Sequence, residues 1–262
     1  MSYVDLHCHL LPGVDDGAPT LDHSAAYARR LRAEGTRDVL VTPHVNDIWS
    51  LDILSIPERV AQLSDDLRRR GLALRLHAGA EVAHTRAAGL SQEELETVAV
   101  GPAPARWLLL EAPFTGIDDE FLEVARELRA RGVGAVIAHP ERAPGVAEDG
   151  FRHLLALVAE GAVLQVNVCS LLGNNGLTAQ EVAVRLLRNG LAYVIASDAH
   201  PGSRDHSLQL GFHLALRAGA SSEQAWRLTQ ANPRFLLRHG IPADRPELVP
   251  ADASQPAASQ RS

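Results

Sequence analysis

The segment Tyr3–His9 (YVDLHCH) decides the fold, because it joins an apolar run typical of a strand to two histidines two residues apart. On an extended chain, His7 and His9 point to the same face, as a pair must to bind one ion. Asp198 and His200 repeat this spacing after another apolar run. Segments so distant in sequence meet only if the fold gathers the ends of its strands. The carboxyl end of a parallel barrel is such a place.

Strand-like runs alternate with amphipathic stretches along the whole chain. The predicted strands are Tyr3–His9, Asp38–Thr42, Ala73–Ala78, Trp107–Glu111, Gly134–Ala138, Val163–Val168 and Ala192–Ala196. The predicted helices, most of which end before a glycine, span residues 21–34, 57–70, 91–99, 119–131, 151–160, 178–189, 207–218 and 222–239. Such alternation implies parallel strands with right-handed crossovers. We therefore predict an α/β fold, a distorted TIM-like (β/α)7 barrel, with an open doubly wound sheet as the alternative.

Length and composition permit one large domain. The chain has 262 residues, 46% of them hydrophobic, and can bury a large core. We expect residues 1–241 to form a single domain and residues 242–262, dominated by Pro, Ala, Asp, Ser and Gln, to be a disordered tail. The net charge of −7 argues against a nucleic-acid-binding protein. The sequence shows neither a signal peptide nor an apolar run that could cross a bilayer, so we expect a cytoplasmic protein.

Nine side chains that can bind metals fall at or just beyond the carboxyl ends of the predicted strands. They are His7, His9, Asp16, His44, Glu81, Glu111, His139, Asp198 and His200. A catalytic zinc ion takes about three protein ligands and an octahedral ion about six ligands in all, so nine donors indicate two or three divalent ions. Mixed imidazole and carboxylate donors favour manganese, iron or zinc over calcium or magnesium.

Histidines without a place at a strand end are interpreted as surface or hydrogen-bonded residues, the commoner case for a lone histidine. They are His23, His77, His84, His153, His206, His213 and His239. Asp5, two residues before His7, has two interpretations. It either orients an imidazole that binds metal or forms a salt bridge at the bottom of the barrel.

Arg142 and Arg204 follow two of the donor segments and indicate phosphate chemistry. Guanidinium groups match phosphate oxygens in geometry and charge, so beside a metal cluster we favour phosphate binding over surface ion pairs. Neither Cys8 nor Cys169 is followed six residues later by arginine, and we expect both to be reduced, buried strand residues. The motifs of a P-loop, a dinucleotide site and a serine-nucleophile elbow are also missing. The expected nucleophile is therefore metal-bound hydroxide.

The motifs resemble those of the polymerase and histidinol phosphatase (PHP) superfamily. More narrowly, they are similar to the manganese-dependent tyrosine-protein phosphatases of bacterial capsule and exopolysaccharide loci. The matching segments are Asp5–Ala18 (DLHCHLLPGVDDGA), Thr42–His44, Gly79–Glu81, Leu110–Phe114 (LEAPF), Ala138–Arg142 (AHPER), Gln165–Asn167, Ser170–Gly173, Ser197–His200 and Asn232–Pro233. The first and fifth of these are the most specific.

This resemblance implies a trinuclear metal site, with manganese as the expected ion. The implied ligands are His7, His9, Glu111 and Asp198 for one ion, Glu81, Glu111 and His139 for a second, and Asp16, His44 and His200 for a third. Arg142, Arg204 and Asp198 would be the catalytic residues, the arginines by contact with substrate. The chain departs from the family pattern in two places. Residues 45–56 are more apolar than expected, and Arg204 stands closer to His200 than usual.

The resemblance implies a metal-dependent phosphomonoester hydrolase, most simply a protein-tyrosine phosphatase acting on a phosphotyrosine protein. A tyrosine kinase of the polysaccharide locus is the candidate partner. A phenolate leaving group, with an unperturbed pKa of about 10, needs less help from a general acid than an alkoxide does. This suits a site without an obvious dedicated acid. Two alternatives stay open: a small-molecule phosphatase of the histidinol-phosphatase type, and a non-catalytic metal-binding regulatory module.

Overall fold

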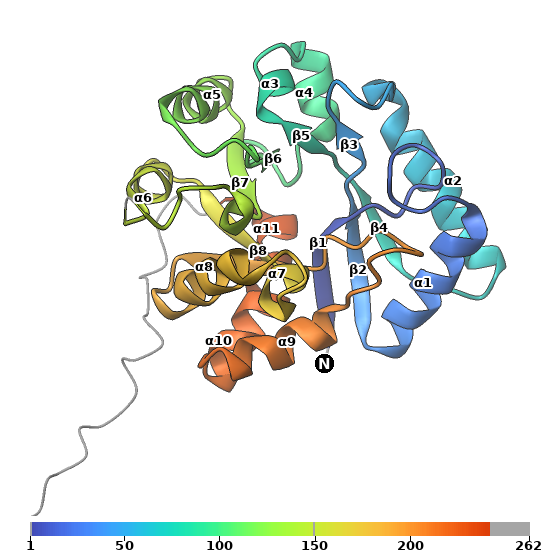
Figure 1. Ribbon diagram of the computed structural model, residues 1–262. Helices are drawn as coiled ribbons and strands as arrows, with labels where there is room; N and C mark the ends of the chain where they lie inside the picture. Colours follow the sequence, from blue (N-terminus) through green and yellow to red (C-terminus); the bar gives the residue numbers. More distant parts are fainter. Residues whose placement is uncertain (1, 149, 242–262) are drawn as a thin grey trace, which may run out of the picture.

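A computed structural model describes residues 2–148 and 150–241, so the tail expected at 242–262 lies outside the described residues. The protein is a mixed α/β fold with parallel strands at its centre and helices around them (Figure 1). One sheet has the order β1-β2-β4, with β1 at Tyr3–Cys8, β2 at Thr36–Val41 and β4 at Arg75–Ala78. The other has the order β3-β5-β6-β7-β8-β9, with bounds His44–Val45, Glu81–Ala83, Trp107–Glu111, Gly134–Ala138, Val163–Asn167 and Ala192–Ala196.

Two of the predicted strands continue beyond a two-residue break. Residues 42–43 separate β2 from β3, and residues 79–80 separate β4 from β5. Pro43 lacks an N–H group and so interrupts the ladder, but its carbonyl oxygen accepts a hydrogen bond from the N–H of Glu81 at 3.1 Å. His44 and Glu81, which the sequence places just after strands, therefore begin the short continuations β3 and β5.

The first and last strands meet at their carboxyl ends. Cys8 pairs with Ala199 in a parallel bridge just beyond β9. The N–H of His9 donates to the carbonyl oxygen of Ala199, and the N–H of Asp198 donates to the carbonyl oxygen of His7. Both distances are 2.9 Å. These bonds place both predicted pairs of donors, at 7 and 9 and at 198 and 200, beside one another.

The predicted helical regions are helical and follow in order, and two short helices, α3 and α7 below, are additional. The helices are α1 (Leu21–Ala33), α2 (Ile56–Arg69), α3 (His84–Ala87), α4 (Gln92–Val98), α5 (Asp119–Ala130), α6 (Arg152–Ala159), α7 (Val168–Leu172), α8 (Leu177–Arg188), α9 (Leu208–Arg217), α10 (Ser222–Trp226) and α11 (Asn232–His239). The 3-10 turns η1 (Ile53–Ser55) and η2 (Pro140–Arg142) and the π-helical turn η3 (Arg227–Ala231) complete the list. Side-chain caps fix several starts. The Asp118 carboxylate accepts from the N–H of Phe121, and Ser91 and Glu94 form a capping box.

The structure corrects the sequence prediction at two helices. The single helix expected at 222–239 is divided into α10, η3 and α11. Pro233, at the start of α11, has no N–H to donate into the preceding turn, which accounts for the irregular hydrogen bonding there. The strand expected at 163–168 ends at Asn167, and α7 follows at once, so Cys169 is helical rather than in a strand.

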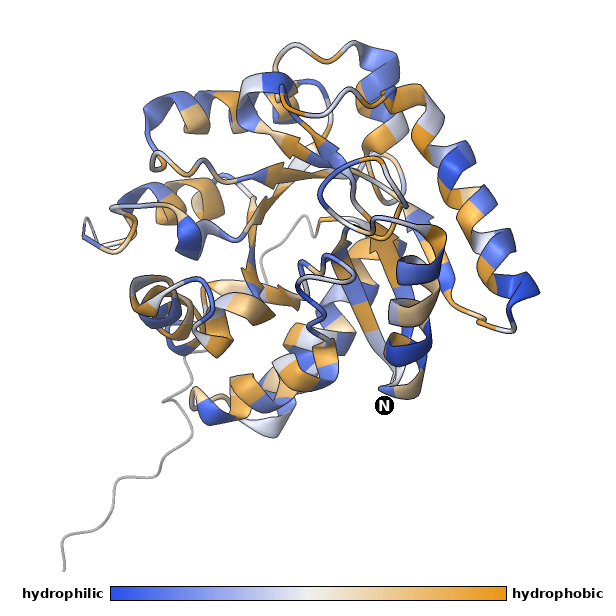
Figure 2. Ribbon diagram, turned by 45° about the vertical axis from the view of Figure 1, so that its right-hand side comes forward, coloured by the Kyte–Doolittle hydropathy of each residue, from blue (hydrophilic) through white to orange (hydrophobic). Residues whose placement is uncertain are grey.

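Apolar side chains pack on both faces of the strands, as expected for parallel sheets covered by helices. Figure 2 shows the matching pattern of hydropathy, with hydrophobic residues along the central strands. The larger cluster lies between strands and helices, and a smaller one joins Val4, Leu109 and Val136 to Leu236 of α11. The indole N–H of Trp107 donates to the carbonyl oxygen of Leu236 at 3.1 Å and fixes α11 to the start of β6. Among the described helices, none combines the length and apolar character needed to cross a membrane.

Candidate functional site

The structure brings the nine predicted donors together at the carboxyl ends of the strands. Three overlapping groups place their ligand atoms within 4.8 Å of one another. The groups are His7, His9, Glu81 and Asp198; His9, Asp16, His44 and His200; and His44, Glu81 and Glu111. His139 joins these groups through Glu81, because Nε2 of His139 lies 2.7 Å from Oε1 of Glu81. The seven histidines set aside in the sequence lie outside these groups.

The most buried group has two imidazoles facing two carboxylates. The Nε2 atoms of His7 and His9 lie 3.2 Å apart. Oε2 of Glu81 is 3.1 Å from the first nitrogen and 3.3 Å from the second, and Oδ1 of Asp198 lies 3.4 and 3.5 Å away. These four side chains are almost fully buried. Such a convergence of nitrogen and carboxylate oxygen atoms is the donor set that divalent transition metals prefer.

Hydrogen bonds on the far side of each imidazole set its orientation. Nδ1 of His7 lies 2.9 Å from Oε1 of Gln165, and Nδ1 of His9 lies 2.9 Å from Oδ2 of Asp15. Each oxygen can only accept, so each Nδ1 carries a proton, and in the neutral form of each ring Nε2 presents its lone pair to the cluster. Asp15 also accepts from the N–H of His44, which ties the loop after β1 to β3.

A network of side-chain amides holds Oδ2 of Asp198, the carboxylate oxygen that does not face His7 and His9. Nε2 of Gln165 donates to Oδ1 of Asn167 at 2.6 Å, and Nδ2 of Asn167 donates to Oδ2 of Asp198 at 2.7 Å. Glu141 accepts from the N–H of Asn167 at 2.9 Å. Burial raises the pKa of Glu141 to about 7. One continuous chain of hydrogen bonds thus links His7, through Gln165 and Asn167, to Asp198.

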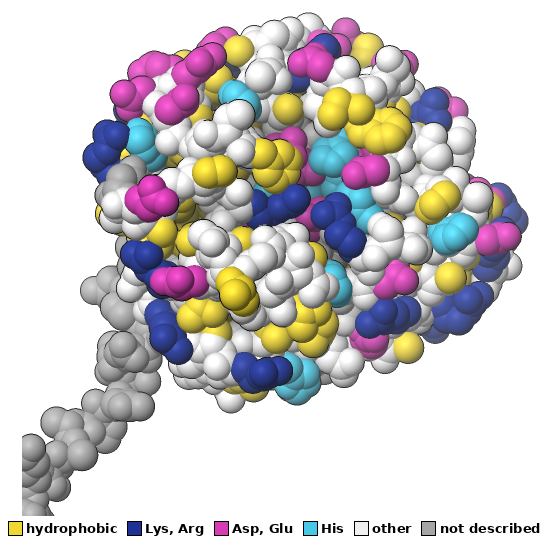
Figure 3. All heavy atoms as spheres, in the orientation of Figure 1, with side chains coloured by type: hydrophobic (Ala, Val, Ile, Leu, Met, Phe, Trp, Pro, Cys, Tyr) yellow, Lys and Arg dark blue, Asp and Glu magenta, His cyan; other side chains and the backbone are white. Residues whose placement is uncertain are grey.

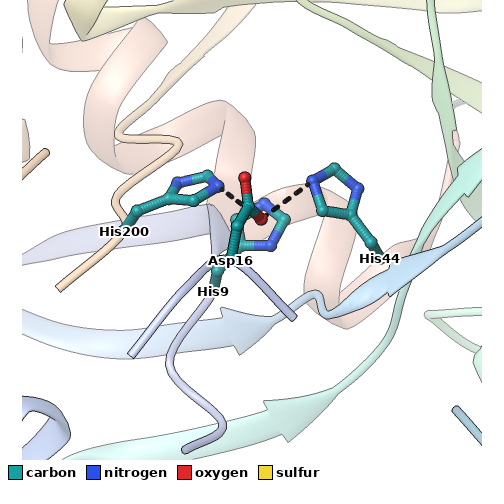
Figure 4. Close-up of side chains that lie close together, drawn as sticks. All are labelled: His9, Asp16, His44 and His200. Carbon is teal, nitrogen blue, oxygen red and sulfur yellow. Dashed lines mark ion pairs between the residues drawn. The ribbon is translucent and has the colours of Figure 1, made fainter. Parts of the chain in front are cut away.

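The second group is more open and is centred on Asp16 (Figure 4). Oδ1 of Asp16 lies 3.2 Å from Nε2 of His200 and 3.4 Å from Nε2 of His44. The contact with His200 lowers the pKa of Asp16 to about 2. The Asp16 side chain is 51% exposed, so this group forms the solvent side of the site.

Glu81 and Glu111 lie so close together that a negative charge on Glu81 disfavours ionisation of Glu111. Burial and the neighbouring Glu81 raise the pKa of Glu111 to about 8. Despite its burial, the pKa of Glu81 is held well below its usual range by His7 and His44. A cation between the two carboxylates would remove their repulsion.

Buried polar atoms without hydrogen bonds supply a test of whether metal ions fit. Oε2 of Glu81, Nδ1 of His44 and Nδ1 of His139 are buried and form no hydrogen bond. The first two lie 3.1 Å apart, but without the geometry of a hydrogen bond. Orphaned donors and acceptors are costly in a protein interior unless another partner binds them. The residues present therefore fit divalent cations.

Strained backbone turns two of the donors toward the cluster. His139 and Asp198 have φ values of 35° and 49°, in the left-handed region that non-glycine residues rarely adopt. Such a conformation costs on the order of 1–3 kcal/mol and persists where surrounding contacts hold it. His139 directly follows β7 and Asp198 lies two residues beyond the end of β9, so the turn redirects side chains that regular pleating would point elsewhere.

Both predicted arginines lie against the donor groups. Nη1 of Arg142 is 3.4 Å from Oδ2 of Asp198, and Nη2 of Arg204 is 2.6 Å from Nε2 of His200. Figure 3 shows basic side chains gathered beside histidines and carboxylates at the centre of this face. Arg142, whose side chain is 20% exposed, thus touches a donor residue, a contact that the sequence does not indicate.

Several residues of the site carry no role in the sequence prediction. Asp15, Gln165 and Glu141 contact the donors or their supports. All three lie in segments that resemble the family motifs, and Gln165 is in addition a polar residue within an apolar run. Asp5 matches neither of its two interpretations, since its Oδ1 accepts from the N–H groups of Ser197 at 3.0 Å and His7 at 3.4 Å, and contacts no imidazole nitrogen.

The cysteines are unsuited to nucleophilic catalysis. Cys8 and Cys169 are both free and buried, as predicted. Burial raises the pKa of the Cys8 thiol well above its ordinary value, and it raises that of Cys169 as well. Because the thiolate is the reactive form, both are poor nucleophiles at neutral pH.

Known proteins are similar to this chain in sequence and in fold. Tyrosine-protein phosphatase YwqE of Bacillus subtilis is 30% identical over 239 residues, which cover 90% of this chain and 92% of YwqE. Tyrosine-protein phosphatase CpsB of Streptococcus pneumoniae is 25% identical over 244 residues, which cover 89% of this chain and 98% of CpsB. A solved structure from the work on YwqE and CpsB, described as metal-dependent tyrosine phosphatases, superposes with a TM-score of 0.77 at 28% identity. It covers 90% of this chain and 94% of the solved one.

More distant structures share the fold alone. The phosphotriesterase homology protein of Escherichia coli superposes with a TM-score of 0.57 at 16% identity.

The family model described as capsular polysaccharide synthesis, CpsB/CapC, matches residues 3–238, nearly all of the described chain. The motif resemblance to capsule-locus tyrosine phosphatases is thereby confirmed, and the chain belongs to the CpsB/CapC family.

Proposed function

We propose that this chain is a metal-dependent phosphomonoester hydrolase that removes phosphate from tyrosine in proteins. The observation that carries this proposal is the convergence of nine metal donors and two guanidinium groups at one end of the strands. YwqE and CpsB, its relatives in the family, are tyrosine-protein phosphatases. Because the family concerns capsular polysaccharide synthesis, we further propose a tyrosine kinase of a polysaccharide locus as the phosphotyrosine protein substrate.

The proposed architecture is one distorted barrel of seven β/α units, with residues 1–241 as a single domain. Treating β2 with β3, and β4 with β5, as broken single strands leaves seven strands in one continuous order. The bridge between Cys8 and Ala199 supports closure between the first and last of them. The donors would then surround one barrel mouth.

We propose that the donors hold two or three divalent ions, with manganese favoured and iron or zinc as alternatives. The proposed ligands are His7, His9, Asp16, His44, Glu81, Glu111, His139, Asp198 and His200. Glu81 is the residue best placed to serve more than one ion, since its two oxygens face four histidines. When bound, such ions supply an activated water near neutral pH and neutralise charge on the phosphoryl oxygens.

The chain's own residues would position the substrate. Arg142 and Arg204 can each present two N–H groups to phosphoryl oxygens and strengthen those contacts as negative charge builds up. Asp198 connects the two functions, because it faces His7 and His9 on one side and Arg142 on the other. A tyrosine phenolate leaves without strong assistance, which matches the absence of a dedicated acid among these residues.

A comparison of substrates tests the proposed function. The manganese-loaded full chain should show its highest kcat/KM on a phosphotyrosine peptide, compared with the same peptide carrying phosphoserine and with histidinol phosphate. A preference for histidinol phosphate would favour the small-molecule phosphatase. Full metal occupancy without hydrolysis of any phosphate ester would favour the regulatory module.

The amide network predicts a loss of metal affinity when Gln165 is replaced. Gln165→Met removes the acceptor that fixes the His7 tautomer and should weaken metal binding by roughly 10- to 100-fold. Competition with a chromophoric chelator measures the affinity, and a thermal melt with excess metal confirms folding. Gln62→Met, on the exposed face of α2, is the matched control. Unchanged affinity in Gln165→Met would show that the His7 orientation does not depend on this contact.

A further inference from the structure

Phe114 is an exposed aromatic ring at the edge of the candidate site. It follows the end of β6, three residues after Glu111, and 54% of its surface is accessible to solvent. It is one of eight large apolar side chains that are exposed among the described residues. Neither the proposed metal ligands nor the proposed phosphate contacts account for an exposed phenyl ring at this position.

Two residues of the site hold the ring in place. The Phe114 and His139 rings are nearly parallel, with an interplanar angle of 8° and centroids 6.1 Å apart. The guanidinium carbon of Arg142 lies 4.6 Å from the Phe114 centroid. Stacking and cation–π contacts of this kind fix the position of a ring, while half of its surface stays in contact with water. A rigid, exposed aromatic surface of this kind is suited to binding a second ring.

The distance between Phe114 and Arg142 determines which group of a bound substrate could contact the Phe114 ring. In an aryl phosphate a single oxygen joins the ring to the phosphoryl group. A phosphoryl group bound by Arg142 therefore brings an aryl ring within a few ångströms of that guanidinium, which itself contacts Phe114. A phosphoserine side chain offers only one methylene at that place. The surface beside Arg142 thus distinguishes the two classes of ester.

We infer that Phe114 is a specificity-determining residue that packs against the aryl group of the substrate and favours aryl over alkyl phosphates. This inference rests on the proposed function, because it assigns Arg142 to the phosphoryl group. An aromatic pair together with the area that it buries should favour the aryl ligand by roughly tenfold. Phe114 is not proposed to take part in the chemical step.

Binding of two phosphonates to the manganese-loaded full chain tests the inference without turnover. Phenylphosphonate and methylphosphonate share the phosphoryl-like group and differ in the ring. Calorimetry should show that the wild-type chain prefers phenylphosphonate and that Phe114→Ala lowers this preference by roughly tenfold, with little change for methylphosphonate. Phe114→Trp, which restores an aromatic surface, should recover most of the preference.

Phe235→Ala is the matched control. Phe235 is 40% exposed and packs against the ring of His239 with a centroid distance of 4.9 Å, but it lies on α11, away from the donor groups. The preference for phenylphosphonate should not change in this variant.

Other outcomes would overturn the inference. Equal weakening of both phosphonates in Phe114→Ala would mean that Phe114 only positions Arg142. An unchanged preference, or a wild-type chain without preference, would mean that no ring packs there. A wild-type chain with a Phe114-dependent preference that fails to hydrolyse a phosphotyrosine peptide would refute the proposed function, whereas the contact between Phe114 and an aryl ring would still be supported.

Discussion

Removing divalent cations from the purified chain should abolish hydrolysis of a phosphotyrosine peptide, and adding manganese back should restore it. We expect a loss on the order of a thousandfold or more, because bound cations supply both the nucleophile and charge neutralisation. Neither cysteine of the described residues is a suitable substitute, because both thiols are buried and have raised pKa values. Chelation followed by dialysis, metal analysis and a phosphate-release assay measures the effect.

The same experiment has a structural readout. Without cations, Glu81, Glu111 and Asp198 stand close together in a buried site, so metal binding should raise the melting temperature in a concentration-dependent manner. Cys8→Ser and Cys169→Ser should retain both the metals and the activity. Activity that survives thorough removal of metal, or that disappears in Cys8→Ser with its metals retained, would contradict the proposed mechanism.

Replacing Arg142 should have the second largest effect. Arg142→Ala should lower turnover by roughly a hundred- to a thousandfold, by analogy with the loss of one transition-state hydrogen-bond donor. Metal content should change little, because the amide of Asn167 holds Asp198 at 2.7 Å whereas Arg142 is 3.4 Å away. Arg142→Lys should recover only part of the rate, since an ammonium group lacks the planar pair of N–H donors.

Arg126 supplies the matched control for this prediction. Its guanidinium forms an exposed ion pair with Glu160, which belongs to none of the donor groups, and Arg126→Ala should keep normal turnover. Steady-state kinetics on a phosphotyrosine peptide and metal analysis of each variant complete the test. Near-normal turnover in Arg142→Ala would show that Arg142 is a structural ion-pair residue and that the phosphate lies elsewhere.

The sequence by itself determined the class of fold and identified the nine donor residues that the structure brings together. Alternating apolar runs and amphipathic stretches predicted parallel strands with helices around them, and the structure confirms both. The nine donors could be named because parallel strands all end at the same side of a sheet. For residues such as His44 and His139, recognising the strand that precedes each of them was therefore enough to predict that they lie near one another.

Tertiary structure alone decided how the site is arranged. Distances between side chains on different strands depend on the stagger of the strands and on local irregularities. Among these are the broken second and third strands and the left-handed turns at His139 and Asp198. No periodic pattern encodes such features, because each is held by contacts between segments distant in sequence. For the same reason, the central place of Glu81, the support from Gln165 and the stacking of Phe114 on His139 emerged only from the fold.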